Sequence, residues 1–135
     1  MNIEIDHLGI AVRNLDEALQ FYSDLIGLEI SCREAIKHER VQIAMLPAGV
    51  LSNSPRIELL EPSDSESTIA KFIEKRGPGL HHIALRVDDL EAVSKRLLSA
   101  GARLLDTPKQ GAGGHAYVFV HPASTGGVLL ELIQK

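Results

Sequence analysis

The chain contains an internal repeat that covers about half of its 135 residues. Segment 5–16 (IDHLGIAVRNLD) aligns with segment 80–91 (LHHIALRVDDLE) at an offset of 75 residues, which places His7 on His82. Each copy has a histidine at the start of an apolar strand, then a polar turn and the start of a helix. A period of half the chain indicates a duplicated module rather than a solenoid, and it limits the folds that the chain can adopt.

The first module, residues 3–62, is predicted to be a βαβββ unit. Asn14, followed three residues later by Glu17, is a variant of the capping box that begins helices. Apolar residues then recur at helical spacing until Gly27, a typical helix stop. The strands of this module are expected at 3–12, 28–33, 41–46 and 56–60.

The second module, residues 80–135, repeats the same order of elements. The connection between the modules, residues 63–79, carries a short amphipathic helix and ends in a Gly-Pro-Gly stop. The helix of the second module is expected at 90–100, and its strands at 80–87, 102–105, 117–120 and 128–133.

The composition excludes several classes of protein. The net charge is −4 and no basic run is present, so nucleic acid is not expected as a partner. No apolar stretch approaches the roughly 18 residues that cross a bilayer, and the N-terminus has no signal-peptide pattern. The single cysteine, Cys32, excludes an intramolecular disulfide. Together these features predict a cytoplasmic protein without a membrane partner.

Four residues recur in register across the repeat and are candidate metal ligands. His7 and His82 open the first strands of the two modules, and Glu58 and Glu131 lie in closely similar apolar tetrapeptides, IELL and LELI. A carboxylate among apolar neighbours is costly to bury without a partner. One such histidine or glutamate alone is more often structural, but the repetition of all four favours a shared divalent metal site.

Five motifs stand out along the chain: IELLEP at 57–62, STIAKF at 67–72, GLHHI at 79–83, FVHP at 119–122 and GGVLLEL at 126–132. They resemble motifs of methylmalonyl-CoA epimerases, a family of the vicinal oxygen chelate superfamily that also contains glyoxalase I, extradiol dioxygenases and bleomycin-resistance proteins. The similarity extends over essentially the whole chain. The segment that runs from IELLEP to IAKF is the part of the chain that narrows the resemblance from the superfamily to the epimerases.

The resemblance implies a fold, a metal site and a substrate class. The fold is α+β: a single domain, 1–135, with two tandem βαβββ modules forming a curved, mostly antiparallel eight-stranded half-barrel around a metal. The implied ligands of Co²⁺, Mn²⁺ or Zn²⁺ are His7, Glu58, His82 and Glu131. The substrate is a small acyl-CoA, the assembly a homodimer. The glycine-rich loop at 111–114 is either an ordinary connection or a surface that the thioester or pantetheine arm approaches closely.

The implied activity is metal-dependent epimerisation of methylmalonyl-CoA, an isomerase reaction in which the α-proton is removed and returned on the opposite face. Glu131 is expected to be one catalytic base, and Glu58 the other. Some relatives have a glutamate on the third strand that faces the substrate, and alignment on Pro47 places Gln42 there. Because glutamine does not exchange a proton at neutral pH, His115, His121 or a metal-bound water stay open as alternatives.

Other functions are compatible with the same fold. A glyoxalase I-like lyase acting on a glutathione hemithioacetal would also bind its metal through four such ligands. A metal-free ligand-binding protein would not need both histidines and both glutamates. An extradiol dioxygenase would use two histidines and one glutamate on iron.

Overall fold

The computed structural model describes residues 2–110 and 114–135, which contain eight strands and four α-helices. Helix α1 continues into a π-helical segment, η1 (Gln20–Leu25), and a 3-10 turn, η2 (Lys37–Glu39), separates β2 from β3. The helices are α1 (Leu15–Leu19), α2 (Thr68–Arg76), α3 (Leu90–Ser99) and α4 (Pro122–Thr125). The strands are β1 (Glu4–Ala11), β2 (Cys32–Ile36), β3 (Val41–Pro47), β4 (Arg56–Pro62), β5 (Gly79–Val87), β6 (Leu104–Gln110), β7 (Ala116–Val120) and β8 (Leu130–Gln134).

The described strands form one open sheet in the order β2-β3-β4-β1-β5-β8-β7-β6. The pairs β1/β4 and β5/β8 are parallel, whereas β2/β3, β3/β4, β6/β7 and β7/β8 are antiparallel. The predicted α+β class with an eight-stranded, mostly antiparallel sheet is therefore confirmed. No helix in the described part of the chain is long and apolar enough to cross a membrane.

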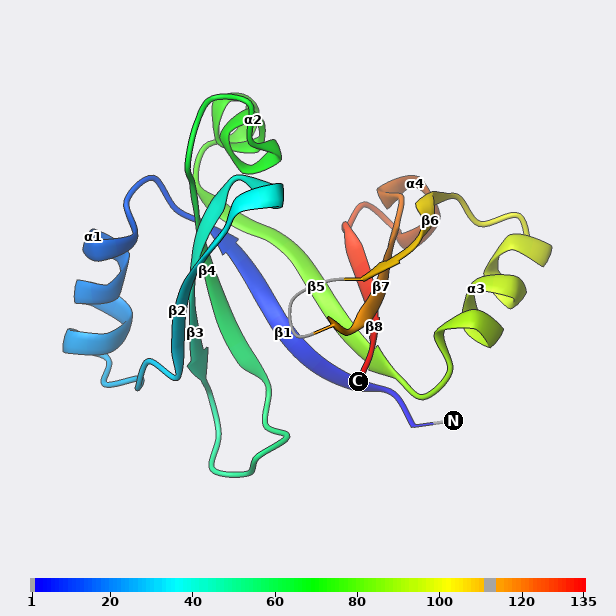
Figure 1. Ribbon diagram of the computed structural model, residues 1–135, viewed down its shortest axis with the longest axis horizontal. Helices are drawn as coiled ribbons and strands as arrows, with labels where there is room; N and C mark the ends of the chain where they lie inside the picture. Colours follow the sequence, from blue (N-terminus) through cyan, green and yellow to red (C-terminus); the bar gives the residue numbers. More distant parts are fainter. Residues whose placement is uncertain (1, 111–113) are drawn as a thin grey trace. The chain divides into compact units, whose positions relative to one another are not determined.

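The chain divides into two compact units. The N-terminal unit is His7–His81, and the C-terminal unit combines Met1–Asp6 with His82–Lys135. Strands β1 and β5, which Figure 1 draws in blue and light green, each contribute residues to both units. The predicted modules, 3–62 and 80–135, differ from these units in the placement of the first residues and of the connection. The single domain over 1–135 stays a prediction.

In the N-terminal unit, α1 packs on one face of β3 and β4, and α2 packs against β4 (Figure 1). The predicted cap is present, because Asn14 Oδ1 accepts a hydrogen bond of 2.9 Å from the Glu17 amide. The apolar residues of alternate strand positions fill two separate clusters, one on each face. The α1 cluster comprises Val12, Leu15, Leu19, Ala44, Leu46 and Leu59, and the α2 cluster comprises Ala11, Val41, Ile43, Leu60, Ile69 and Ile73.

The C-terminal unit repeats the α1 arrangement with α3, which packs against β6 and β8. Its N-cap is Asp89, whose Oδ1 accepts a hydrogen bond of 3.0 Å from the Ala92 amide. The core under α3 is formed by Val87, Leu90, Val118, Val120 and Leu132. In both units, therefore, one face of the sheet is sealed by the helix that follows the histidine-bearing strand.

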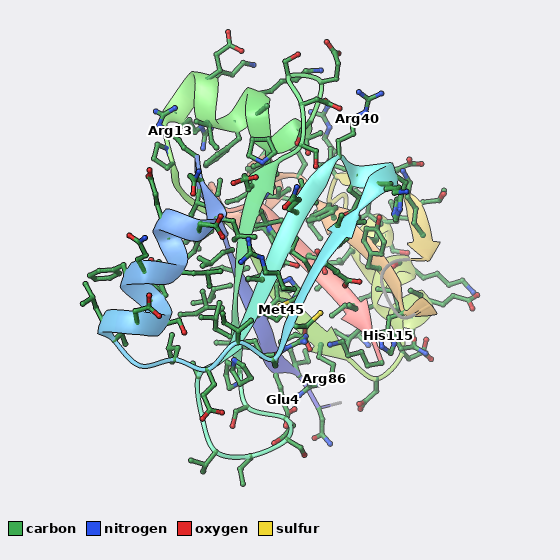
Figure 2. All side chains as sticks on the ribbon, turned by 60° about the vertical axis from the view of Figure 1, so that its left-hand side comes forward. Glu4, Arg13, Arg40, Met45, Arg86 and His115 are labelled. Atoms are coloured by element: carbon green, nitrogen blue, oxygen red, sulfur yellow. The ribbon has the colours of Figure 1, made fainter. Side chains whose placement is uncertain are left out.

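A buried ionic network fixes the start of β1 to the C-terminal unit. Asp6 is only 1% exposed, and its Oδ1 lies 3.0 Å from both Arg86 Nη1 and Lys135 Nζ. Arg86 also pairs with Glu4, and Figure 2 shows these two side chains beside each other. The hydrogen bond to Glu4, with the nearby charge of Asp6, raises the pKa of the Arg86 guanidinium above its usual value. Two cations thus compensate the buried Asp6 carboxylate.

The main departures from the predicted elements lie at the edges of the sheet. The strand expected at 28–33 is instead β2, which starts at Cys32 and continues through the polar residues up to Ile36. Because β2 is an edge strand with mostly exposed side chains, it does not need the apolar alternation on which the prediction relied. Helix α4 was not predicted, and Gly111–Gly113 of the glycine-rich loop lie outside the described residues.

The packing of α3 predicts opposite consequences for two leucines of the same helix. Leu90 is 2% exposed within the core, and Leu98 is 58% exposed. Leu90→Ala should lower the free energy of unfolding by about 2–5 kcal/mol, because it leaves a cavity. Leu98→Ala should change it by only about 0.5 kcal/mol. Urea denaturation measures both, and equal losses would contradict this packing.

Candidate metal centre

The N-terminal unit brings together the predicted ligands His7 and Glu58. In the parallel pair β1/β4, Gly9 is opposite Glu58 and His7 is opposite Arg56, so His7 and Glu58 project from the same face. His7 Nε2 lies 3.6 Å from Glu58 Oε1. Both residues are buried, which makes this pair a polar site within a largely apolar sheet.

The C-terminal unit contains the equivalent pair, His82 and Glu131. Ala84 of β5 is opposite Glu131 of β8, so His82 and Glu131 also share a face. His82 Nε2 lies 3.8 Å from Glu131 Oε1, and both residues are buried. The His82 ring packs edge-on against Phe119, with 5.9 Å between the ring centroids and 88° between the ring planes.

The donor set and spacing of each pair fit a divalent cation. Nitrogen–oxygen hydrogen bonds are about 2.7–3.2 Å long, so Nε2 and Oε1 of each pair are too far apart for a direct one. Two ligands about 2.1 Å from one ion, at angles of about 90–110°, lie about 3.0–3.5 Å apart. The observed 3.6 Å and 3.8 Å are close to that spacing. Imidazole and carboxylate are ligands of Co²⁺, Mn²⁺ and Zn²⁺.

The register of β3 corrects the role considered for Gln42. Gln42 is opposite Glu61, whereas Met45 is opposite Glu58, and Ile43 lies two residues before Met45 on the same face. Gln42 therefore projects from the face opposite to Glu58, and it is exposed. A shift of one residue along a strand moves a side chain to the other face, so a substrate-facing position on β3 does not fall on Gln42. The β3 residues on the Glu58 face are apolar.

Each glutamate has a large apolar residue directly across the adjacent antiparallel strand. This residue is Met45 for Glu58 and Phe119 for Glu131. Sequence reasoning missed these two neighbours, although the repeat relates them. Their offset is 74 residues, whereas the offset is 75 residues for the two histidines and 73 for the two glutamates. An apolar neighbour lowers the local polarity around a carboxylate and strengthens its interaction with a cation.

The two alternative histidines lie in different surroundings. His121 Nδ1 accepts a hydrogen bond of 2.9 Å from the Ala123 amide and caps α4, so this nitrogen has a structural role. His115 is partly buried and directly precedes β7. In the sequence, β7 and α4 lie between His115, which is labelled in Figure 2, and Glu131.

Comparison with known proteins gives a consistent result. Residues 6–119 match the model of the Glyoxalase/Bleomycin resistance protein/Dioxygenase superfamily. The ethylmalonyl-CoA/methylmalonyl-CoA epimerase of Cereibacter sphaeroides is 38% identical over 133 residues, which cover 96% of each chain. The chain belongs to the methylmalonyl-CoA epimerase family of this superfamily.

Solved structures of this family have the same fold. The crystal structure of methylmalonyl-CoA epimerase from Mycobacterium tuberculosis matches with a TM-score of 0.86 and 40% identity, over 96% of this chain and 86% of that chain. A methylmalonyl-CoA epimerase in complex with methylmalonyl-CoA and NH₄⁺ matches with a TM-score of 0.91 and 35% identity, over 100% of this chain and 96% of that chain. The predicted family, and an epimerase as the class of enzyme, are confirmed.

Removal of one histidine tests whether the pairs bind metal. His7→Ala or His82→Ala should abolish tight Co²⁺ binding. The circular dichroism spectrum should stay the same and thermal unfolding should remain cooperative, because each histidine lies outside the apolar clusters. Metal analysis after dialysis measures the loss.

His38→Ala is the matched control, since His38 lies in the exposed turn η2. Full metal retention by both His7→Ala and His82→Ala would exclude these pairs as the metal centre.

Proposed function

We propose that the protein is a metal-dependent epimerase that interconverts the R and S forms of methylmalonyl-CoA. The observation that carries the proposal is the buried His–Glu pair in each of the two units. Two relatives of high similarity, described above, are epimerases of this substrate. The substrate is therefore a small acyl-CoA.

We further propose that His7, Glu58, His82 and Glu131 together hold one divalent ion, Co²⁺, Mn²⁺ or Zn²⁺. When bound, the ion would supply positive charge next to the thioester and carboxylate oxygens and so stabilise the enolate. The donor spacing within each pair supports this assignment.

The acid–base steps are assigned to the two glutamates. Glu131 takes the α-proton from one face of the substrate, and Glu58 exchanges a proton at the other face. The duplication supports this division, because it relates the two carboxylates by the repeat. The strand neighbours of Glu58 on β3, Ile43 and Met45, offer no proton, so β3 contributes no competing base on that face.

The apolar surroundings also suit this chemistry. Met45 and Phe119 lie directly across from the two glutamates and give each carboxylate an apolar neighbour. In apolar surroundings the interaction between a carboxylate and a bound cation is stronger than in water.

A paired assay separates this function from its rivals. Each metal-loaded protein sample is given a single enantiomer of methylmalonyl-CoA in one reaction and the hemithioacetal of glutathione in another. Interconversion of the enantiomers with no turnover of the hemithioacetal is the expected result. Turnover of the hemithioacetal alone would make the protein a glyoxalase I-like lyase, and activity with neither would favour a ligand-binding protein.

The acid–base assignment predicts a specific effect for Glu58→Gln. The glutamine oxygen still ligates a metal, but epimerisation should slow by about 10²–10⁴-fold, the usual contribution of a general acid–base group. Exchange of the α-proton with deuterium from one enantiomer should persist through Glu131. Gln42→Ala is the control, and it should leave turnover unchanged because Gln42 projects from the opposite face. A native rate for Glu58→Gln would leave Glu58 as a ligand alone.

Two further properties complete the proposal. We propose a homodimer, because β2 and β6 are the two ends of the described sheet and unpaired strand edges are commonly covered by oligomerisation. A cytoplasmic location is proposed from the single free cysteine, Cys32, which is exposed.

A further inference from the structure

The first helix residue of each unit forms a hydrogen bond with a distant side chain. The Leu15 amide donates to Glu61 Oε1 over 2.7 Å, and the Leu90 amide donates to Gln134 Oε1 over 2.7 Å. Both bonds are partly buried and close within a single unit. The first N–H groups of a helix have no partner within the helix, so these side chains satisfy donors that would otherwise need water.

The caps do not provide this partner. Asn14 and Asp89 accept hydrogen bonds from the third residue of α1 and α3, as N-caps usually do. The caps leave the amide of the first helix residue without an acceptor, and a side chain near the end of the same module accepts its hydrogen bond. Since Glu61 is negatively charged, its position at the start of α1 is also favoured by the helix dipole.

The spacing relates these two side chains to the candidate metal ligands. Glu61 is three residues after Glu58 on β4, and Gln134 is three residues after Glu131 on β8. Residues three apart on a strand project from opposite faces. Each glutamate-bearing strand therefore presents a candidate ligand on one face and a helix acceptor on the other.

The same bonds connect the glutamate-bearing strand with the histidine-bearing strand. Helix α1 directly follows β1, which carries His7, and α3 directly follows β5, which carries His82. In the N-terminal unit a further backbone bond of 2.9 Å, from the Val12 amide to the Leu60 carbonyl, closes the same connection. The histidine strand, its helix and the glutamate strand thus form a closed loop of contacts in each unit.

We propose that Glu61 and Gln134 are positioning residues, which hold each His–Glu pair at the spacing that a shared cation requires. This inference rests on the proposed metal site and adds two residues that do not contact the cation themselves. The His Nε2 and Glu Oε1 atoms are 3.6 Å apart in one pair and 3.8 Å apart in the other, and sliding of β4 or β8 relative to the adjacent histidine strand would change these distances. The helix amide resists that sliding because its hydrogen bond has a fixed length and direction.

Glu61 and Gln134 occupy equivalent positions in the repeat and differ only as a carboxylate and an amide. One unit uses a carboxylate oxygen and the other an amide oxygen for the same bond, so the acceptor and not the charge is the shared requirement. Glu61→Gln and Gln134→Glu should therefore retain the function that Glu61→Ala and Gln134→Ala lose.

The test measures binding of Co²⁺ alone to the full chain by isothermal titration, and then steady-state turnover of methylmalonyl-CoA. Glu61→Ala and Gln134→Ala should each weaken Co²⁺ binding by about 10–100-fold, the usual effect of losing a group that orients a ligand. The turnover number should fall, whereas KM should change little. Glu61→Gln should remain within about threefold of the wild type, well below that loss.

Two controls separate positioning from general stability. Glu74→Ala removes an exposed glutamate of α2 and should leave Co²⁺ binding unchanged. Amide hydrogen exchange should become faster at Leu15 in Glu61→Ala and at Leu90 in Gln134→Ala, which reports the loss of the bond directly.

The outcomes are distinguishable. Unchanged Co²⁺ affinity in Glu61→Ala and Gln134→Ala, with faster exchange at Leu15 and Leu90, would overturn the positioning role and leave the proposed function intact. Failure of Glu61→Gln to restore binding would also overturn it. A wild-type protein that binds Co²⁺ but does not epimerise methylmalonyl-CoA would contradict the proposed function, and the affinity measurements would still decide the positioning role.

Discussion

Each half of the chain buries a carboxylate beside an imidazole, and this arrangement limits how the strands around it can pair. Glu58 and Glu131 lie in strands whose other residues are largely apolar, where an unpaired charge would be strongly destabilising. The parallel pairs β1/β4 and β5/β8 place a histidine next to each of them. The helices that follow the histidine strands then seal the opposite face of the sheet with apolar clusters. In the N-terminal unit the face that carries His7 and Glu58 also carries the apolar cluster under α2, so this polar pair lies beside apolar packing.

The repeat made most of the fold and the proximity within each His–Glu pair predictable. A histidine opening a strand and a glutamate within a closing strand recur at nearly the same offset, and both pairs are close in the structure. The caps Asn14 and Asp89 bond as their sequence pattern implies. The edge strand β2 was misplaced because an exposed strand has no apolar alternation. Helix α4 was missed because four residues capped by His121 give too short a periodic signal.

The register between strands is what sequence reasoning lacked. Moving one position along β3 transfers a residue from one face of the sheet to the other. The alignment on Pro47 therefore selected Gln42, although Ile43 and Met45 share the face of Glu58. The hydrogen bonds of Glu61 and Gln134 were missed for a similar reason, because their partners are more than forty residues away in sequence. The sequence shows that Glu61 and Gln134 lie three residues after Glu58 and Glu131, respectively. That they accept hydrogen bonds from helix amides becomes clear only once the first residues of α1 and α3 are located.

We propose that His7, Glu58, His82 and Glu131 bind a single metal ion. The most direct test is the stoichiometry of Co²⁺ binding to the metal-free wild-type chain, measured by isothermal titration with the protein concentration fixed by amino-acid analysis. The account predicts one tightly bound ion per chain, with nitrogen and oxygen ligands in the X-ray absorption spectrum. Two equivalent ions per chain would mean that each pair is a separate site, and no tight binding would mean that the pairs are structural; either result would contradict the account.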